Sequence, residues 1–333
     1  MTGGAGQRAE PAQSFVGIDI GGTKLHGLLV DSSGSVLRRV TVPTLASEGS
    51  DAVVARIYAL VECLIPESGI ASIGLGAPGP LDYRTGTIIR TENLPFRDFP
   101  LAGLVERRFK VPTLLENDGS AAAFGEYAFG PARGADPLLY LTASTGIGAG
   151  LVIGGALYRG RTGNALEAGH ISLMAGEGPD CACGGRGCAE ALASGSAIAA
   201  RAREAAEAAR SGSGEPTGLA AFPDPGAKEA FVLAAEGDAA AERIVAQALR
   251  YLGYCAATLV TLFDPEFLVI GGGLVKAGDR VRASVEAAIA ASPAASAGAC
   301  RIIAPGLGED SGALGAAALA AKAFFGVDFA RLA

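Results

Sequence analysis

Apolar runs separated by turn residues predict an α/β fold. In FVGIDIGGTKLHGLLVDSSGSVLRRVTVPT, three β-rich runs are divided by GGT and SSG turns. The next stretch, DAVVARIYALVECLI, has apolar positions three and four residues apart, which predicts a helix that Asp51 can cap. Buried strands are predicted in IASIGLGAPGPLD and VPTLLEND, and short helices in PLAGLVERRF and SAAAFGEYAF.

The same pattern then recurs about half a chain later. LLYLTASTGIGAGLVIGGALYRG again predicts three strands, and each copy turns on a Gly/Thr loop, DIGGTK at 19–24 and STGIGAG at 144–150. This favours two related α/β halves facing each other across a cleft; two independent glycine-rich hairpins are the alternative. Beyond them we predict helices at 190–209, 238–263, 279–290 and 312–325, a loop over 211–227, and a buried strand in EFLVIGGGL.

Composition narrows the class of protein. Half of the 333 residues are hydrophobic and 18% are charged, which supports a sizeable core and excludes disorder along the whole length. A net charge of −7 argues against a nucleic-acid partner, whose binding proteins are usually basic. The polar start MTGGAGQRAEPAQS lacks the apolar centre of a signal peptide, and no apolar run reaches bilayer length. We expect a cytoplasmic protein without a membrane partner.

Three of the six cysteines lie within eight residues, shortly after one of the only two histidines. His170, Cys181, Cys183 and Cys188 make a complete tetrahedral ligand set for structural Zn²⁺, which leaves no open position for catalytic water. Three reduced cysteines in a glycine-rich loop are the alternative. The remaining cysteines, at 63, 255 and 300, have no clustered partners and are expected to be small core residues.

The glycine loops are candidate phosphate sites, because backbone N–H groups in such turns can converge on an anion. In GIDIGGTK, Thr23 can hydrogen-bond a phosphate, Lys24 adds charge, and Asp19 can hold Mg²⁺ through water. An ordinary hairpin is the alternative for any one loop. No Walker loop occurs, and GLGAPG at 74–79 does not open a helix, so a Rossmann dinucleotide site is discounted.

DIGGTK, ENDGSAAAFGE, STGIGAG, ALEAGH, CACGGRGCAE and VIGGGL occur in the order seen in the ROK sugar kinases, and the chain most resembles their bacterial glucokinases. The resemblance implies an actin-like (ribonuclease H-like), two-lobed ATPase fold that binds ATP, Mg²⁺ and a hexose, and a homodimer or homotetramer. We place a flexible tail at 1–14, a small lobe at 15–117 plus about 313–333, and a large lobe at 118–312 with the zinc-binding loop 170–188.

The resemblance also implies residue roles. Asp118 matches the catalytic base, and the metal ligands match His170, Cys181, Cys183 and Cys188. The residues that match sugar contacts are Asn93, Asn117, Asp118, Glu167, His170 and Glu190. Those expected near ATP are Asp19, Gly21, Gly22, Thr23, Lys24, Thr145, Gly146, Gly271, Gly272 and Gly273. From sequence alone, Asp118 could instead be the N-cap of the next helix, and either glutamate could cap a helix or face solvent.

The chain departs from the family pattern in three places. Leu166 replaces the usual glycine of AGE, Ala143-Ser144 precede TGIG, and no tryptophan follows NLP, where Phe96 or Phe99 could substitute. These changes bear on the preferred sugar more than on the reaction.

From the resemblance we expect an ATP-dependent glucokinase, with N-acetylmannosamine, N-acetylglucosamine or fructose as alternative sugars and polyphosphate as an alternative donor. A non-catalytic regulator is less favoured, because about fourteen residues before the first strand are too few for a DNA-reading domain. A zinc-binding interaction module would leave END at 116–118 unexplained.

Overall fold

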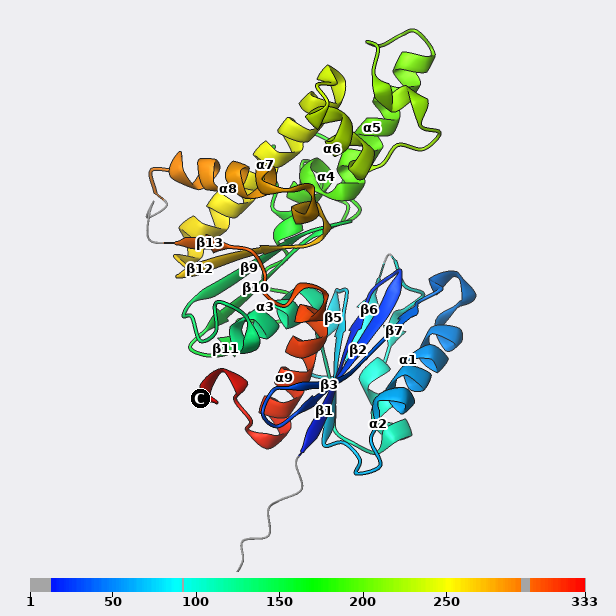
Figure 1. The fold of residues 1–333 in the computed structure, drawn as a ribbon, viewed down its shortest axis with the longest axis vertical. Coiled ribbons are helices and arrows are strands. Elements are labelled where there is room, and N and C mark those ends of the chain that lie inside the picture. Colours follow the sequence, from blue (N-terminus) through cyan, green and yellow to red (C-terminus); the bar gives the residue numbers. More distant parts are fainter. Residues whose placement is uncertain (1–12, 92, 295–299, 333) are drawn as a thin grey trace, which may run out of the picture. The chain divides into compact units, whose positions relative to one another are not determined.

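The computed structural model describes residues 13–91, 93–294 and 300–332 (Figure 1). Most of the tail predicted for residues 1–14 lies outside the described residues, and Ser14 already begins the first strand. The chain forms two compact units. Unit 1 comprises Met1–Gly134, Arg159–Asn164 and Gly306–Ala333, and unit 2 comprises Ala135–Tyr158 and Ala165–Pro305.

Unit 1 is built on a five-stranded sheet with the order β3-β2-β1-β4-β8. Its strands are β1 (Ser14–Ile20), β2 (Lys24–Asp31), β3 (Val36–Pro43), β4 (Ser72–Ala77) and β8 (Thr113–Asn117). The first three are antiparallel neighbours, as the GGT and SSG turns predicted, and β4 and β8 run parallel to β1. The carboxyl ends of β1, β4 and β8 therefore meet at one edge of the sheet.

Four helices cover this sheet (Figure 1): α1 (Ser50–Leu64), α2 (Leu101–Phe109), α3 (Asp118–Phe129) and α9 (Ser311–Phe325). Helix α9 lies very close to the strands because glycines face it. A Cβ on Gly17 would come 1.9 Å from the carbonyl oxygen of Ala313, and one on Gly74 would come 1.8 Å from that of Ala316. The close approach also brings Gly312, in the first turn of α9, against Asp19.

A second, three-stranded sheet in unit 1 was not predicted. It consists of β5 (Leu81–Asp82), β6 (Thr87–Arg90) and β7 (Arg97–Phe99), in that order. These strands are too short to give a periodic signal in the sequence. The connection between β6 and β7 carries Asn93.

Unit 2 repeats the plan of the first sheet, with the order β11-β10-β9-β12-β13. The strands are β9 (Leu138–Ala143), β10 (Ile147–Ile153), β11 (Ala156–Leu157), β12 (Phe267–Gly271) and β13 (Arg301–Ile303). Again three antiparallel strands come first, and two later strands add in parallel beside the first of them. The predicted duplication of α/β halves is confirmed.

The helices of unit 2 are α4 (Ala189–Ala193), α5 (Gly195–Arg210), α6 (Ala227–Ala235), α7 (Ala239–Phe263) and α8 (Asp279–Ala290). The helix predicted at 190–209 is divided at Ser194, whose side chain caps α5. Helix α7 is long and apolar enough to cross a membrane by length and composition alone, and 56% of its most apolar window is buried inside the protein. Core helices share these properties, and α7 packs against α4, α5, α6 and α8.

Short 3-10 segments complete the described secondary structure: η1 (Ala46–Glu48), η2 (Ala168–His170), η3 (Gly218–Ala221), η4 (Gly273–Ala277), η5 (Gly308–Asp310) and η6 (Phe329–Arg331). Three further sequence expectations differ from the structure. Cys63 is exposed and Cys300 is half-buried, so of the three cysteines expected in the core, Cys255 alone is buried. The units divide at 134 and 306 rather than at 117 and 313, because α3 packs closely against α9 of the same unit. Asp51 lies in the first turn of α1 without capping it, because Gly49 occupies the N-cap.

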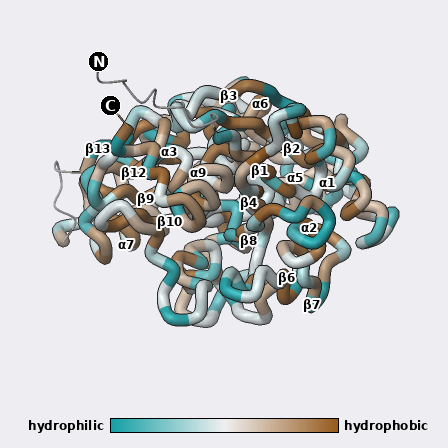
Figure 2. The backbone as a smooth tube through the Cα atoms, turned by 90° about the horizontal axis from the view of Figure 1, so that it is seen from below, coloured by the Kyte–Doolittle hydropathy of each residue, from teal (hydrophilic) through white to brown (hydrophobic). Residues whose placement is uncertain are grey.

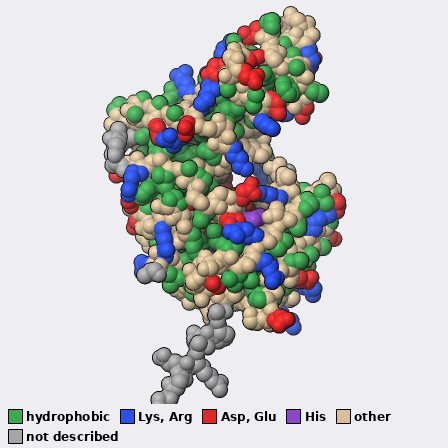
Figure 3. All heavy atoms as spheres, in the orientation of Figure 1, with side chains coloured by type: hydrophobic (Ala, Val, Ile, Leu, Met, Phe, Trp, Pro, Cys, Tyr) green, Lys and Arg blue, Asp and Glu red, His purple; other side chains and the backbone are tan. Residues whose placement is uncertain are grey.

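Hydropathy along the backbone follows this layering (Figure 2): apolar stretches follow strands such as β1 and β12. On the face drawn in Figure 3, acidic and basic side chains are interspersed. Basic side chains do not gather into one continuous patch on that face, in keeping with the net charge of −7.

Candidate active site and metal centre

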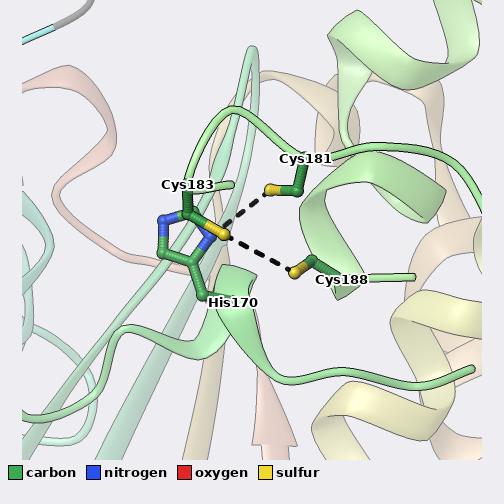
Figure 4. Close-up of side chains that lie close together, drawn as sticks. All are labelled: His170, Cys181, Cys183 and Cys188. Atoms are coloured by element: carbon green, nitrogen blue, oxygen red, sulfur yellow. Dashed lines mark hydrogen bonds between the residues drawn. The ribbon is translucent and has the colours of Figure 1, made fainter. Parts of the chain in front are cut away.

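The four residues predicted as metal ligands lie together in unit 2 (Figure 4). Their ligand atoms all lie within 4.8 Å of one another. The Cys183 and Cys188 Sγ atoms are 3.8 Å apart, and Cys181 Sγ is 3.6 Å from His170 Nδ1. A tetrahedron around a zinc ion with ligand bonds of about 2.0–2.3 Å has edges of about 3.5–3.8 Å, so the four groups fit that ion.

Tight turns bring the cysteines together. The N–H of Cys181 donates to the Gly185 carbonyl, the N–H of Gly184 donates back to the Cys181 carbonyl, and Cys188 is the N-cap residue of α4. Burial raises the pKa of Cys181 and raises that of Cys188 to about 12, whereas the backbone N–H of Gly185 lowers the pKa of Cys183. A metal ion bound here would displace thiol protons.

Two carboxylates meet at the strand edge of unit 1. Asp19 lies near the end of β1, and Asp118 follows β8 directly as the first residue of α3. Burial, with the negative charge of Asp118 as the second cause, raises the pKa of Asp19 to about 7, and Lys24 partly opposes this. Desolvation also raises the pKa of Asp118, although its side chain keeps exposed surface.

The helix cap is Asn117 rather than Asp118. The Asn117 side-chain oxygen accepts the Ser120 N–H at 3.1 Å, which leaves the amide NH₂ for another acceptor. One Asp118 oxygen accepts the neighbouring Gly119 N–H at 2.7 Å. Because Asn117 does the capping, the second Asp118 oxygen is available for chemistry.

The first glycine loop, between β1 and β2, is supported by a residue that sequence reasoning missed. Thr44 is fully buried; its hydroxyl donates to the Gly21 carbonyl at 2.6 Å, and its N–H donates to the Thr23 carbonyl at 2.9 Å. Gly22 lies against Asn93, because a Cβ on Gly22 would come 2.9 Å from the Asn93 Cβ. The first glycine loop and one predicted sugar contact are thus neighbours within unit 1.

Lys24 is the first residue of β2, and its side chain has an acidic partner. Its Nζ forms an ion pair of 2.6 Å with Glu309, just before α9. The following residue, Asp310, bonds the Nε2 of His26 at 2.8 Å, and the His26 Nδ1 meets the Thr41 hydroxyl at 2.7 Å. The interpretation of His26 as a structural residue agrees with these contacts.

The second glycine loop, between β9 and β10, is held by Glu190. The Glu190 Oε2 accepts the Ile147 N–H at 2.9 Å, and a Cβ on Gly146 would come 2.4 Å from the same oxygen. Gly169 lies between the predicted sugar contacts Glu167 and His170. It packs against the same loop, because a Cβ on Gly169 would come 2.4 Å from the Ile147 carbonyl oxygen. The STGIG, EAGH and CAE motifs therefore pack as one piece of unit 2.

The third glycine run ends β12 beside this loop. Gly272 has a φ of 93°, and a Cβ there would come 2.3 Å from the Ala143 carbonyl oxygen, so a side chain is excluded both by conformation and by space. Gly273 lies near the Ser144 hydroxyl. The GGG run thus lies against Ala143 and Ser144, the two residues that immediately precede Thr145 and Gly146.

The predicted residues fall into two sets. Unit 1 carries Asp19, Gly21, Gly22, Thr23, Lys24, Asn93, Asn117 and Asp118; unit 2 carries Thr145, Gly146, Glu167, His170, the three cysteines, Glu190 and the GGG run. Phe96, one candidate substitute for the missing tryptophan, is only 2% exposed and stacks on Phe99 in the core of unit 1. Leu166 takes the left-handed conformation, with a φ of 68°, at the position where the family pattern has glycine.

Two similarly built α/β units, each with three antiparallel strands extended by parallel ones and ending in glycine loops, define the actin-like class of two-lobed ATPase folds. The chain belongs to the ROK family, whose model matches residues 15–323.

Relatives in sequence include a glucokinase of Streptomyces coelicolor, 36% identical over 80% of this chain and 84% of that protein. An N-acetylmannosamine kinase of Escherichia fergusonii is 35% identical over 91% and 97% of the two chains. Among solved structures, a ROK hexokinase from Thermus thermophilus is 38% identical, with a TM-score of 0.77 over 92% of this chain and 97% of that one. A ROK glucokinase from Streptomyces griseus, solved with glucose and AMPPNP, is 32% identical, with a TM-score of 0.76 over 92% and 98%.

Proposed function

We propose that this protein is an ATP-dependent hexose kinase that transfers the γ-phosphoryl group of ATP to glucose, giving glucose 6-phosphate and ADP. The observation that carries the proposal is the position of Asp118. It begins α3 beside the Asp19 carboxylate, and the capping role that would explain it otherwise belongs to Asn117. The glucokinase and hexokinase relatives support the same reaction.

In unit 1, Asp118 is the general base for the sugar 6-hydroxyl, and Asn93 and Asn117 are sugar ligands. Transfer of a phosphoryl group depends mostly on positioning and charge stabilisation, so orientation of the carboxylate matters more than its basicity. The desolvation that raises the pKa of Asp118 also brings it closer to the task of accepting a proton. Gly21, Gly22, Thr23 and Lys24 receive the phosphates of ATP.

In unit 2, Glu167, His170 and Glu190 are sugar ligands, and Thr145, Gly146 and the GGG run at 271–273 contact the nucleotide. His170 keeps its Nε2 for a sugar hydroxyl, because Nδ1 faces the cysteines. Zn²⁺ held by His170, Cys181, Cys183 and Cys188 would brace this wall without entering the chemistry. Asp19 would hold Mg²⁺ through water, and that ion, when bound, neutralises charge on the phosphates.

The preferred sugar is tested by measuring ADP release on a panel of glucose, mannose, fructose, N-acetylglucosamine and N-acetylmannosamine, with ATP or polyphosphate as donor. We expect the highest kcat/KM for glucose with ATP. A clear preference for N-acetylmannosamine would favour the alternative that the Escherichia fergusonii relative suggests. No turnover with any sugar would refute the kinase proposal and favour a non-catalytic regulator.

The base is tested by Asp118→Asn, which we expect to retain the fold and sugar binding while turnover falls by about a hundredfold or more. Asp98→Asn, a change of the same chemistry on the small sheet, is a control that should leave turnover unchanged. Turnover of Asp118→Asn near that of the wild type would remove Asp118 from the role.

We also propose that the protein acts in the cytoplasm as a homodimer or homotetramer. Membership of the ROK family supports this. Light scattering of the purified protein tests the oligomeric state, and a monomer at micromolar concentration would contradict it.

A further inference from the structure

The segment Arg159–Asn164 belongs to unit 1, although the chain on both sides of it belongs to unit 2. Three contacts hold it. Arg159 bonds Glu116, the Arg161 carbonyl accepts from Arg84 at 3.0 Å, and Gly163, with a φ of 93°, lies against the Tyr83 ring. Of these residues, Glu116 belongs to the END motif at 116–118, whereas no role was assigned from sequence to Arg159, Arg161, Arg84, Gly163 or Tyr83.

The ion pair is the contact closest to the proposed chemistry. Arg159 Nε lies 2.6 Å from Glu116 Oε2, and only 1% of the Glu116 side chain and 23% of the Arg159 side chain are exposed. The other oxygen of Glu116 accepts the N–H of Asn117 at 3.1 Å. One carboxylate thus joins Arg159 to the backbone of the residue that immediately precedes Asp118.

Arg159 is itself held in place. Its guanidinium lies over the ring of Tyr83, 4.9 Å from the centroid. Stacking of this kind suits arginine and not lysine, because the planar guanidinium can lie over a ring while its N–H groups bond in the plane. The Glu116 carboxylate therefore meets a donor of fixed direction.

We propose that Arg159 is a positioning residue of the phosphoryl-transfer site: through Glu116 it fixes the turn that presents Asn117 and Asp118. A buried carboxylate whose cationic partner is removed must find new donors or admit water. Either response moves the oxygen that holds the Asn117 N–H, and the turn moves with it. A displacement of about 1 Å at a reacting group can lower a rate by about a hundredfold. The inference rests on the proposed function, in which Asp118 is the base.

Four variants test the inference: Arg159→Gln, Arg159→Lys, Glu116→Gln and the double variant Glu116→Gln/Arg159→Gln. We expect Arg159→Gln to lower kcat about 10- to 100-fold with the KM for ATP within about twofold, because the glycine loops are untouched. Arg159→Lys should fall between the wild type and Arg159→Gln. The double variant should recover part of the lost kcat, because two amides can bond without leaving a buried charge unpaired.

Arg84→Gln is the matched control. Arg84 lies over the same Tyr83 ring, also at 4.9 Å, and bonds the same segment, but it does not contact Glu116. It should leave kcat within about twofold. Thermal midpoints of all variants separate loss of fold from loss of position, and if Arg159→Gln does not fold, the kcat of Arg159→Lys and Glu116→Gln decides the matter.

The inference is overturned if Arg159→Gln lowers only the thermal midpoint and keeps kcat, or if Arg84→Gln loses as much kcat as Arg159→Gln. These outcomes can be distinguished from failure of the proposed function. If the proposed function is wrong, the wild-type protein itself will not phosphorylate a hexose.

Discussion

Asp19 should make the folded protein less stable at neutral pH than it would be with a neutral side chain in its place. Burial and the nearby charge of Asp118 raise its pKa from 3.8 to about 7. Each pKa unit corresponds to about 1.36 kcal/mol, so the ionised carboxylate costs the fold on the order of 4 kcal/mol. The substitution Asp19→Asn removes that cost and retains the size of the side chain.

The sign of the pH dependence follows from linkage. Because the pKa is higher in the folded chain than in the unfolded chain, the contribution of Asp19 to stability is fully present below about pH 4 and is lost as the pH rises to about 7. At pH 5 the folded protein holds this proton, but the unfolded chain has largely lost it, so Asp19→Asn should already be the more stable by about 1.6 kcal/mol. At pH 8, Asp19→Asn should be the more stable by up to about 4 kcal/mol.

Urea unfolding at pH 5 and pH 8, in buffer without Mg²⁺, measures both free energies. Asp19→Asn should also lose most of its turnover, so that it gains stability and loses function together, as expected for a residue kept for its chemistry. Asp118→Asn is an informative second variant, because removal of that charge should lower the pKa of Asp19 and reduce the slope. Equal or lower stability of Asp19→Asn at pH 8 would refute the reasoning.

Three further results are expected. Gly146→Ala should raise the KM for ATP, because the added Cβ would displace the Glu190 oxygen that holds the Ile147 N–H. Gly148→Ala is the control, and an unchanged KM for ATP in Gly146→Ala would contradict this role of Gly146. Cys183→Ser should lower bound zinc, measured by elemental analysis, and the thermal midpoint, whereas Cys63→Ser outside the cluster should change neither. Glu126→Gln should lower the free energy of unfolding by about 2 kcal/mol in urea, because Glu126 is fully buried and accepts from Gly306 N–H, Leu307 N–H and the Ser311 hydroxyl; an unchanged midpoint would argue against this.

The long, regular parts of the fold were predictable because their signals are local. Three apolar runs divided by GGT and SSG predict β1, β2 and β3, and the recurrence at 138–157 predicts the second sheet. The clustering of the four candidate metal ligands was also predictable, because their residue types are rare in this chain and closely spaced. In each case the residues that form the feature are neighbours, or nearly so, along the sequence.

Residues that act through tertiary contacts left no such signal. Thr44 follows β3 and resembles any turn threonine, yet it holds the backbone of the first glycine loop. Glu126 and Arg159 look like surface charges in sequence, but their partners lie 180 and 43 residues away. The division of the units was misplaced for the same reason, because the packing of α3 on α9 joins segments far apart in the chain.

Leu166 shows how a departure from the family pattern can be reconciled with the structure. The backbone at this position is left-handed, a conformation that costs a residue with a Cβ roughly 1–2 kcal/mol and costs glycine nothing. The Leu166 side chain packs against the core of unit 2, and this burial offsets part of the cost. The departure therefore preserves the backbone that leads into Glu167 while it adds apolar contact beneath it.

The contacts of Glu190 link the proposed metal centre to the second glycine loop. Cys188 is the N-cap residue of α4, Glu190 lies in the first turn of that helix, and its carboxylate holds the N–H of Ile147 at the second glycine loop. A change at Cys188 can therefore reach the glycine loop through one turn of helix and one hydrogen bond. If the metal only braced the sugar wall, Cys183→Ser would raise the KM for glucose alone. We expect the KM for ATP to rise with it, because Glu190, the proposed sugar ligand, also holds the second glycine loop, which we propose contacts the nucleotide.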